Sequence, residues 1–230
     1  MIPFFVSKLF IETAKDLFTD SKSSISINIM NFLSIDCSTD ISSLFLKTQT
    51  KTFSKILQSD KYSNDLLMIQ ILDFFRKNQV GFEDISEILV NQGPGNFSGL
   101  RGSLATAKGI CLSTKLKLSG YNTFLWACSN FFDKKDSVYS LVHFRDKYFI
   151  KKFNKKLIAA SKETEVTEEE IIKNYENKFK VIAKSAIKYF DKKILKLSNL
   201  SIVDLDHNQL EFLKSKDLLD SNSIKPLYLS

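Results

Sequence analysis

The residues whose types and spacing could do chemistry are a glycine-rich segment and one aspartate. Five of the 7 glycines and one of the 3 prolines lie within residues 93–109, and Asp36 ends a short apolar run. A glycine-rich turn between a strand and a helix can hold a phosphate on the backbone amides of the helix. The segment has neither the Gly-Lys-Ser/Thr of a P-loop nor the Gly-x-Gly-x-x-Gly spacing of a dinucleotide fold. Phosphate binding is therefore one of two interpretations.

The second interpretation is close helix packing. Small residues recur three or four positions apart in the helix expected after the turn, at Gly99, Gly102, Thr106 and Gly109. Each interior glycine costs about 1 kcal/mol relative to alanine, and this cost is tolerated where another backbone approaches closely. The pattern therefore favours a helix packed on this bare face over a cofactor loop.

The other candidate catalytic groups lack partners in the sequence. His143 and His207 are 64 residues apart, which excludes a His-x-x-x-His metal pair, and no Ser-His-Asp grouping includes them. The three glutamates at 168–170 suit the N-terminus of a helix, where the helix dipole favours acids. The 3 cysteines show no Cys-x-x-Cys spacing, so we expect no disulfide framework, no zinc site and a reducing, cytoplasmic compartment.

Composition indicates an ordinary globular chain of 230 residues, 43% hydrophobic, which excludes a disordered or multispanning protein. The net charge is +7, and residues 131–197 alone hold 17 basic against 10 acidic side chains. This excess suits a polyanion such as RNA. It also suits a solvated lysine-rich surface, because 30 of the 33 basic residues are lysine, and both interpretations stay open.

Alternating strands and helices must position these residues. Residues 1–29 are too charged for a signal peptide or a membrane span, and this leader is expected to be either an appended helix or an upstream start that is seldom translated. In the first half we predict strands over 32–36, 42–47, 48–57 and 85–90, and helices over 64–77 and 98–113. In the second half we predict a hairpin over 137–144 and 147–153, a helix capped by Thr167, a strand over 180–183 and a helix over 206–214.

The helix over 64–77 is apolar on two sides. Its first stripe consists of Leu67, Ile71 and Phe74, and its second stripe consists of Met68, Leu72 and Phe75. One sheet cannot cover both stripes. The helix is therefore either central in its own domain or meets a helix of another protein through the second stripe.

Residues 93–101 read Gly-Pro-Gly-Asn-Phe-Ser-Gly-Leu-Arg. This stretch resembles the Gly-Pro-Gly-Ser-Phe-Thr-Gly-Leu-Arg motif of the TsaB (YeaZ) family. The similarity continues in residues 30–39, in Thr123 at the start of a helix and in residues 226–229. The resemblance implies an α/β, two-lobed, actin-like (ASKHA, ribonuclease H-like) fold.

The domains implied are a leader over 1–29, a first lobe with dimerisation helices over 30–126 and a smaller lysine-rich lobe over 127–230. The resemblance further implies a non-catalytic scaffold that forms a heterodimer with a TsaD-like protein. With a TsaE-like ATPase, that assembly forms N6-threonylcarbamoyladenosine next to the tRNA anticodon. It implies no cofactor, no metal and no membrane. We also expect a homodimer in isolation, and direct tRNA contact stays open.

Two sets of residues follow from the motifs and the resemblance. The partner interface is expected at Leu67, Met68, Ile71, Leu72, Phe75, Gly99, Gly102, Thr106 and Gly109. The motif loop consists of Gly93, Pro94, Gly95, Phe97, Ser98 and Arg101, with Ser98 as the expected N-cap of the following helix.

The alternative function is an ATP-dependent enzyme of the same fold that uses Asp36 and the loop over 93–99. Active relatives of the fold have a glycine after the corresponding aspartate, whereas residues 36–39 here read Asp-Cys-Ser-Thr. Without that glycine a phosphate cannot approach the backbone closely. The departure favours the non-catalytic interpretation.

Overall fold

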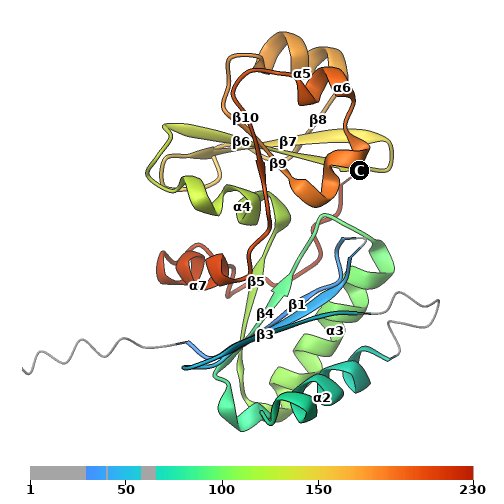
Figure 1. The fold of residues 1–230 in the computed structure, drawn as a ribbon, viewed down its shortest axis with the longest axis vertical. Helices are drawn as coiled ribbons and strands as arrows, with labels where there is room; N and C mark the ends of the chain where they lie inside the picture. Colours follow the sequence, from blue (N-terminus) through green and yellow to red (C-terminus); the bar gives the residue numbers. More distant parts are fainter. Residues whose placement is uncertain (1–29, 40, 58–65, 230) are drawn as a thin grey trace, which may run out of the picture.

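The computed structural model describes residues 30–39, 41–57 and 66–229, so the expected leader over 1–29 lies outside the described residues. Two five-stranded sheets lie one above the other in Figure 1. The first sheet has the order β3-β2-β1-β4-β5 and the second the order β10-β9-β6-β7-β8. This is the expected α/β, two-lobed arrangement.

The first sheet is mixed. Strand β1 pairs antiparallel with β2 and parallel with β4, and β4 pairs parallel with β5. Parallel neighbours need a crossover, which α3 supplies between β4 and β5. The elements are β1 (Phe32–Asp36), β2 (Ser43–Lys47), β3 (Thr52–Ile56), α2 (Leu67–Asn78), η1 (Phe82–Asp84), β4 (Glu87–Asn91), α3 (Phe97–Thr114) and β5 (Lys117–Tyr121).

The second sheet is built on the long predicted hairpin. Strands β6 and β7 pair antiparallel, and β9 pairs parallel with both β6 and β10. The elements are α4 (Thr123–Cys128), η2 (Ser129–Phe131), β6 (Ser137–Phe144), β7 (Lys147–Asn154), β8 (Thr164–Val166), α5 (Glu168–Tyr175), β9 (Lys180–Ala183), η3 (Lys184–Tyr189), α6 (Lys192–Leu195), β10 (Leu200–Val203) and α7 (Asn208–Ser215). Thr167 and Glu170 form the predicted capping box of α5.

Alternation along the strands divides the core into layers. In β1, Leu33 and Ile35 face α2 and α3 in one apolar cluster, whereas Phe32 faces the second lobe in another, because successive strand residues point to opposite faces. That second cluster holds α4, the inner faces of both sheets and part of α7. A third cluster lies under α5 and α6. Of the three clusters, the second one therefore joins the two lobes.

The end of the chain returns to the first lobe. Helix α7 lies beside the first sheet in Figure 1, and Lys214 Nζ donates to Glu87 Oε1 at 2.7 Å. Gly120 and Asp220 form a β-bridge, and Leu227 N donates to Gln92 O at 2.7 Å. Residues that the sequence assigns to the second lobe thus cover the other face of the first sheet.

Candidate functional site

The motif loop is fastened to its neighbours by backbone hydrogen bonds. Gly93 has a φ of 105°, which favours glycine. Its N–H donates to Asn91 Oδ1 at 2.9 Å, and its carbonyl accepts from Thr123 N at 2.9 Å. Further along the loop, Asn96 N donates to Ser38 O at 3.0 Å. The loop is therefore held between the end of β1 and the start of α4.

Two glycines of the motif let the chain's own backbone approach. A Cβ on Gly95 would lie 1.8 Å from Ser38 O, and a Cβ on Gly99 would lie 2.2 Å from Cys37 O. No side chain fits at either distance. Gly99 is thus buried against the end of β1 and is not available to a partner, which corrects its expected place in the interface.

The helix cap also differs from the prediction. Asn96, and not Ser98, is the N-cap of α3, and its Oδ1 accepts from Ser98 N at 3.0 Å. Asparagine is as good an N-cap as serine, so α3 begins two residues earlier than expected. Phe97, Ser98 and the later Arg101 are exposed, whereas Pro94 is buried.

Asp36 is shielded from the space between the lobes. Its side chain is 3% exposed, and Oδ1 accepts from Ser38 N at 2.9 Å and from Ser38 Oγ at 2.7 Å. Burial raises its pKa above the usual value, against the lowering effect of the Ser38 hydrogen bonds. Since both hydrogen bonds come from its own turn, the carboxyl group is positioned to fix the turn.

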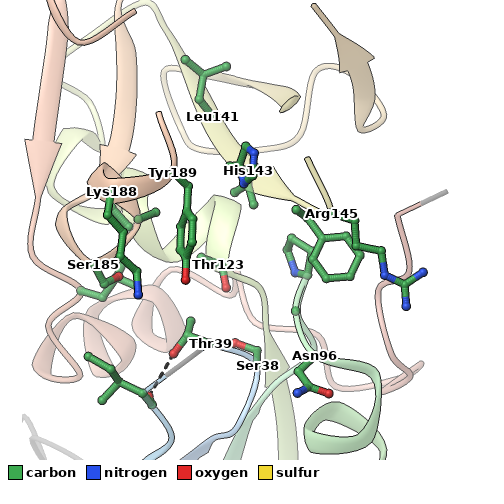
Figure 2. Close-up of a pocket in the computed structure, with 18 of the residues that line it drawn as sticks. Ser38, Thr39, Asn96, Thr123, Leu141, His143, Arg145, Ser185, Lys188 and Tyr189 are labelled. Atoms are coloured by element: carbon green, nitrogen blue, oxygen red, sulfur yellow. Dashed lines mark hydrogen bonds between the residues drawn. The ribbon is translucent and has the colours of Figure 1, made fainter. Parts of the chain in front are cut away.

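A cavity of about 380 Å³ lies between the lobes. Figure 2 shows Ser38, Thr39 and Asn96 of the first lobe on one side, with His143 and Tyr189 of the second lobe opposite them. Its lining includes apolar, hydroxyl and cationic side chains, and among the residues that the structure describes it contains neither aspartate nor glutamate. The cavity can therefore accept an anionic or neutral group more readily than a cation.

His143 and Arg145, both at the end of the β6–β7 hairpin, belong to this cavity. The His143 ring stacks on Tyr189 with centroids 5.5 Å apart and an interplanar angle of 7°. Burial lowers the pKa of His143, although Asp146 acts in the opposite direction, so the ring is neutral at pH 7. Arg145 adopts a left-handed φ of 49° and is exposed at one edge of the cavity.

A second candidate site is the outer face of α2 and α3, which we call the two-helix face. It carries five exposed aliphatic or thioether side chains: Leu66, Met68, Ile69, Leu72 and Leu112. Leu72 is 44% exposed and Leu112 is 85% exposed. In Figure 1 the two helices lie side by side on the side of the first sheet away from the second lobe.

The predicted interface residues divide between this face and the core. Leu67, Ile71 and Phe75 are buried in the chain's own core, so they do not form part of any exposed surface. Of the second stripe, Phe75 is therefore buried, whereas Met68 and Leu72 are exposed. On α3 three predicted small residues remain accessible: Gly102 and Thr106 are half-buried, and Gly109 is exposed with open space around it.

Two further observations concern only the described residues. Within them, no group of three or more His, Cys, Asp or Glu side chains is arranged to hold a metal ion. Of the helices in the same ranges, none has both the length and the apolar character needed to cross a membrane.

Known proteins match this chain in sequence and in fold. The family model described as TsaD, tRNA N6-adenosine threonylcarbamoyltransferase, matches residues 57–143. The tRNA threonylcarbamoyladenosine biosynthesis protein TsaB of Buchnera aphidicola subsp. Baizongia pistaciae (strain Bp) is 31% identical over 90 residues. That alignment spans 38% of this chain and 40% of the relative, less than half of either.

Two solved structures from Pseudomonas aeruginosa share the fold over most of the chain. An uncharacterized protein with similarity to peptidase YEAZ has a TM-score of 0.66 at 15% identity. YeaZ has a TM-score of 0.64 at 14% identity. Each match covers 87% of this chain and 100% of the solved chain.

Two mixed lobes that face each other across a cavity, together with these structural matches, define an α/β protein of the actin-like, ribonuclease H-like (ASKHA) fold. Within that class the motif at 93–101 and the matches to TsaB and YeaZ are specific. The chain is therefore similar in sequence to TsaB over part of its length, and it shares the fold of YeaZ.

Sequence reasoning missed the contacts that join distant parts of the chain. The exposed rings of Phe97 and Tyr228 stack with centroids 5.3 Å apart, although 131 positions separate them. His207 lies over the first sheet, where Nδ1 is 3.2 Å from Ser34 Oγ and Nε2 is 3.3 Å from Ser43 Oγ. No local pattern encodes these pairs, because they depend on the return of the chain to the first lobe.

Proposed function

We propose that the chain is a non-catalytic scaffold subunit that pairs with a TsaD-like protein through the two-helix face. In this proposal the complex acts in the cytoplasm with a TsaE-like ATPase. It transfers a threonylcarbamoyl group to the adenosine next to the tRNA anticodon. The name of the matched relative and the TsaD-type family model support this biosynthetic role.

The observation that carries the proposal is the exposure of Met68 and Leu72 beside the accessible small residues of α3. Apolar side chains exposed on neighbouring helices mark protein interaction surfaces. The bare helix at Gly102 and Gly109 lets a partner helix approach closely. Since five exposed aliphatic or thioether side chains lie on this face, the surface suits a helix of another protein better than a small ligand.

The geometry at Asp36 argues against the ATP-dependent alternative. Its Oδ1 accepts two hydrogen bonds from Ser38, and the backbone of Ser38 fills the space beside Gly95. The glycines of the loop therefore serve the packing of the chain. On this proposal the isolated chain hydrolyses no ATP. The Asp36→Asn variant therefore has the same absent ATPase activity as the unaltered chain.

The test is binding to the TsaD-like protein of the same organism, measured by calorimetry and size exclusion. We expect a heterodimer that Leu72→Glu weakens by at least about tenfold, because a charge would be buried at the contact. The matched control is Ile158→Glu, since Ile158 is also exposed but lies in the second lobe. No complex with the unaltered chain, or equal weakening by both variants, would contradict the proposal.

The same face provides the expected homodimer when the partner is absent. A twofold dimer would place Met68 and Leu72 of one copy against those of the other. Light scattering of the chain alone should show a dimer at tens of micromolar concentration and a monomer after Leu72→Glu. A monomeric unaltered chain would remove the homodimer from the proposal and leave the heterodimer standing.

A further inference from the structure

The exposed aromatic side chains of the described residues gather around the space between the lobes. They are Phe97, Tyr189 and Tyr228, which are 45%, 39% and 51% exposed. Tyr189 lines the interlobe cavity, and Phe97 lines both that cavity and a neighbouring one of about 260 Å³ that Tyr228 also lines. We call this region the aromatic mouth. Exposed rings that lie together are unusual on a protein surface and mark a binding site.

Arginines accompany these rings. The guanidinium of Arg101 lies 4.9 Å from the centroid of the Phe97 ring, and Arg145 lines both cavities. Within the described ranges neither arginine forms an ion pair. The chain has only one other arginine, Arg76, which lies on α2 away from the mouth. Two of three arginines therefore border a region of exposed aromatic rings.

Cationic side chains outnumber acidic ones around the mouth among the described residues. Within that part of the chain neither cavity has a lining aspartate or glutamate, and Figure 2 places Lys188 at the opposite edge from Arg145. Asp146 is the nearby exception, since it follows Arg145 in the hairpin turn. A cationic rim suits a ligand that carries phosphates, and exposed rings suit one that carries planar bases.

We propose that the aromatic mouth binds a single-stranded segment of RNA. A base stacks on the exposed ring surface of Tyr228 beside Phe97, and Arg145 and Arg101 contact the flanking phosphates. A single strand is required because bases inside a duplex are already stacked and out of reach. The inference rests on the proposed function only for the origin of the strand, which would be the tRNA substrate.

A protein segment is the competing occupant, and the aromatic type of the residues argues against it. The two-helix face already offers aliphatic side chains for a protein, whereas rings with arginines are the combination used by proteins that bind single strands. Charge complementarity points the same way, because a rim that carries Arg145 and Lys188 attracts a polyanion.

The test is fluorescence anisotropy of the full chain with a labelled single-stranded oligoribonucleotide of about eight nucleotides, within the site size of a single-strand-binding domain. We expect Phe97→Ala and Tyr228→Ala each to weaken binding by at least about fivefold. Phe97→Tyr should keep the affinity, and Phe97→Leu should lose it, because leucine keeps apolar volume without a ring face. Retained binding by Phe97→Leu would overturn the stacking contact.

Arg76→Ala is the matched control for Arg145→Ala, because both side chains are exposed. The inference requires that Arg145→Ala weakens binding and that Arg76→Ala changes it less than about twofold. Equal losses would show that general surface charge binds the RNA. Tight binding of a duplex of the same length, or no binding at about 50 mM salt, would also overturn the inference.

Pairing with the TsaD-like protein distinguishes this test from that of the proposed function. Phe97→Ala should leave the heterodimer intact, since the mouth and the two-helix face are separate surfaces. Absence of RNA binding by the unaltered chain, with an intact heterodimer, would sink only the inference. If Phe97→Ala weakens the heterodimer and leaves RNA binding unchanged, the mouth is a protein contact and the inference is wrong.

Discussion

The two-helix face and the aromatic mouth are both exposed and both apolar, but they differ in the side chains that they present. The two-helix face presents Met68, Leu72 and Leu112, which are flexible and uncharged. The aromatic mouth presents Phe97 and Tyr228 beside arginines. Aliphatic side chains contribute most free energy to binding when another apolar surface removes them from water. Rings beside cations also recognise planar and anionic groups. On these two proposals, the type of exposed side chain separates a protein site from a nucleic-acid site on one molecule.

The first way to sharpen this comparison uses two neighbours on α2. Ile71 is fully buried and Leu72 is 44% exposed. Ile71→Ala should lower the free energy of unfolding by about 2 to 5 kcal/mol, because it removes core volume and leaves a cavity. Leu72→Ala should change it by less than about 0.5 kcal/mol. Urea unfolding of the two variants measures the difference, and similar losses would show that Leu72 belongs to the core.

The two stripes of α2 illustrate what the sequence can and cannot predict. Its periodicity correctly indicates two apolar sides, because the repeat of 3.6 residues is local. The assignment of Phe75 to the partner side is wrong because the chain's own packing covers this side chain, which contacts the ring of Phe82. The glycine-rich motif likewise predicts close packing, but only the fold shows that Gly99 meets Cys37.

Element prediction succeeds where the signals are strong and local. The β6–β7 hairpin and the capping box of α5 match the structure closely. Strands β5, β8 and β10 escape prediction because they are short and gain their stability from neighbouring strands. The aromatic mouth escapes for a similar reason, since Tyr228 reaches Phe97 only after the chain has returned to the first lobe.

A second way to test the comparison uses glycines at the two ends of α3. Gly99→Ala should lower the free energy of unfolding by about 1 to 3 kcal/mol, because the methyl group would overlap Cys37 O. Gly109→Ala should raise it by about 1 kcal/mol, since the helix gains propensity and the position is open. Thermal unfolding of the two variants measures whether each substitution lowers or raises the stability. Gly109→Leu should then weaken the heterodimer without destabilising the chain, and unaffected pairing would move the interface away from α3.

A third prediction concerns the two sides of the first sheet. The side under the two-helix face is an aliphatic core, whereas the opposite side contains His207, which stacks on Phe45 and is partly exposed at the surface. Its two ring nitrogens point inward to hydroxyl groups. Desolvation lowers the pKa of His207 from 6.5 to about 4, against the raising effect of Asp206.

Because this folded pKa lies below the unfolded value, the unfolded chain binds more protons between those two pH values. Stability is therefore lost as the pH falls from 6.5 towards 4, by up to about 2 kcal/mol at pH 5. The raised pKa of Asp36 acts with the opposite sign. The measurement is thus the difference in urea unfolding between the unaltered chain and His207→Gln at pH 7 and pH 5. Parallel pH dependence of the two proteins would contradict the prediction.

The smallest expected effect is also the most direct contrast between the two surfaces. Binding of single-stranded RNA at the aromatic mouth should weaken as salt rises from about 50 to 200 mM, because phosphate contacts release counterions. Heterodimer formation through the exposed aliphatic side chains of the two-helix face should change less over the same range. Arg145→Ala should reduce the slope of log affinity against log salt by about 0.7, the share of one single-strand phosphate contact. An unchanged slope would remove Arg145 from the phosphate contact. An equally steep slope for the heterodimer would show that charged residues, and not the aliphatic face, determine pairing.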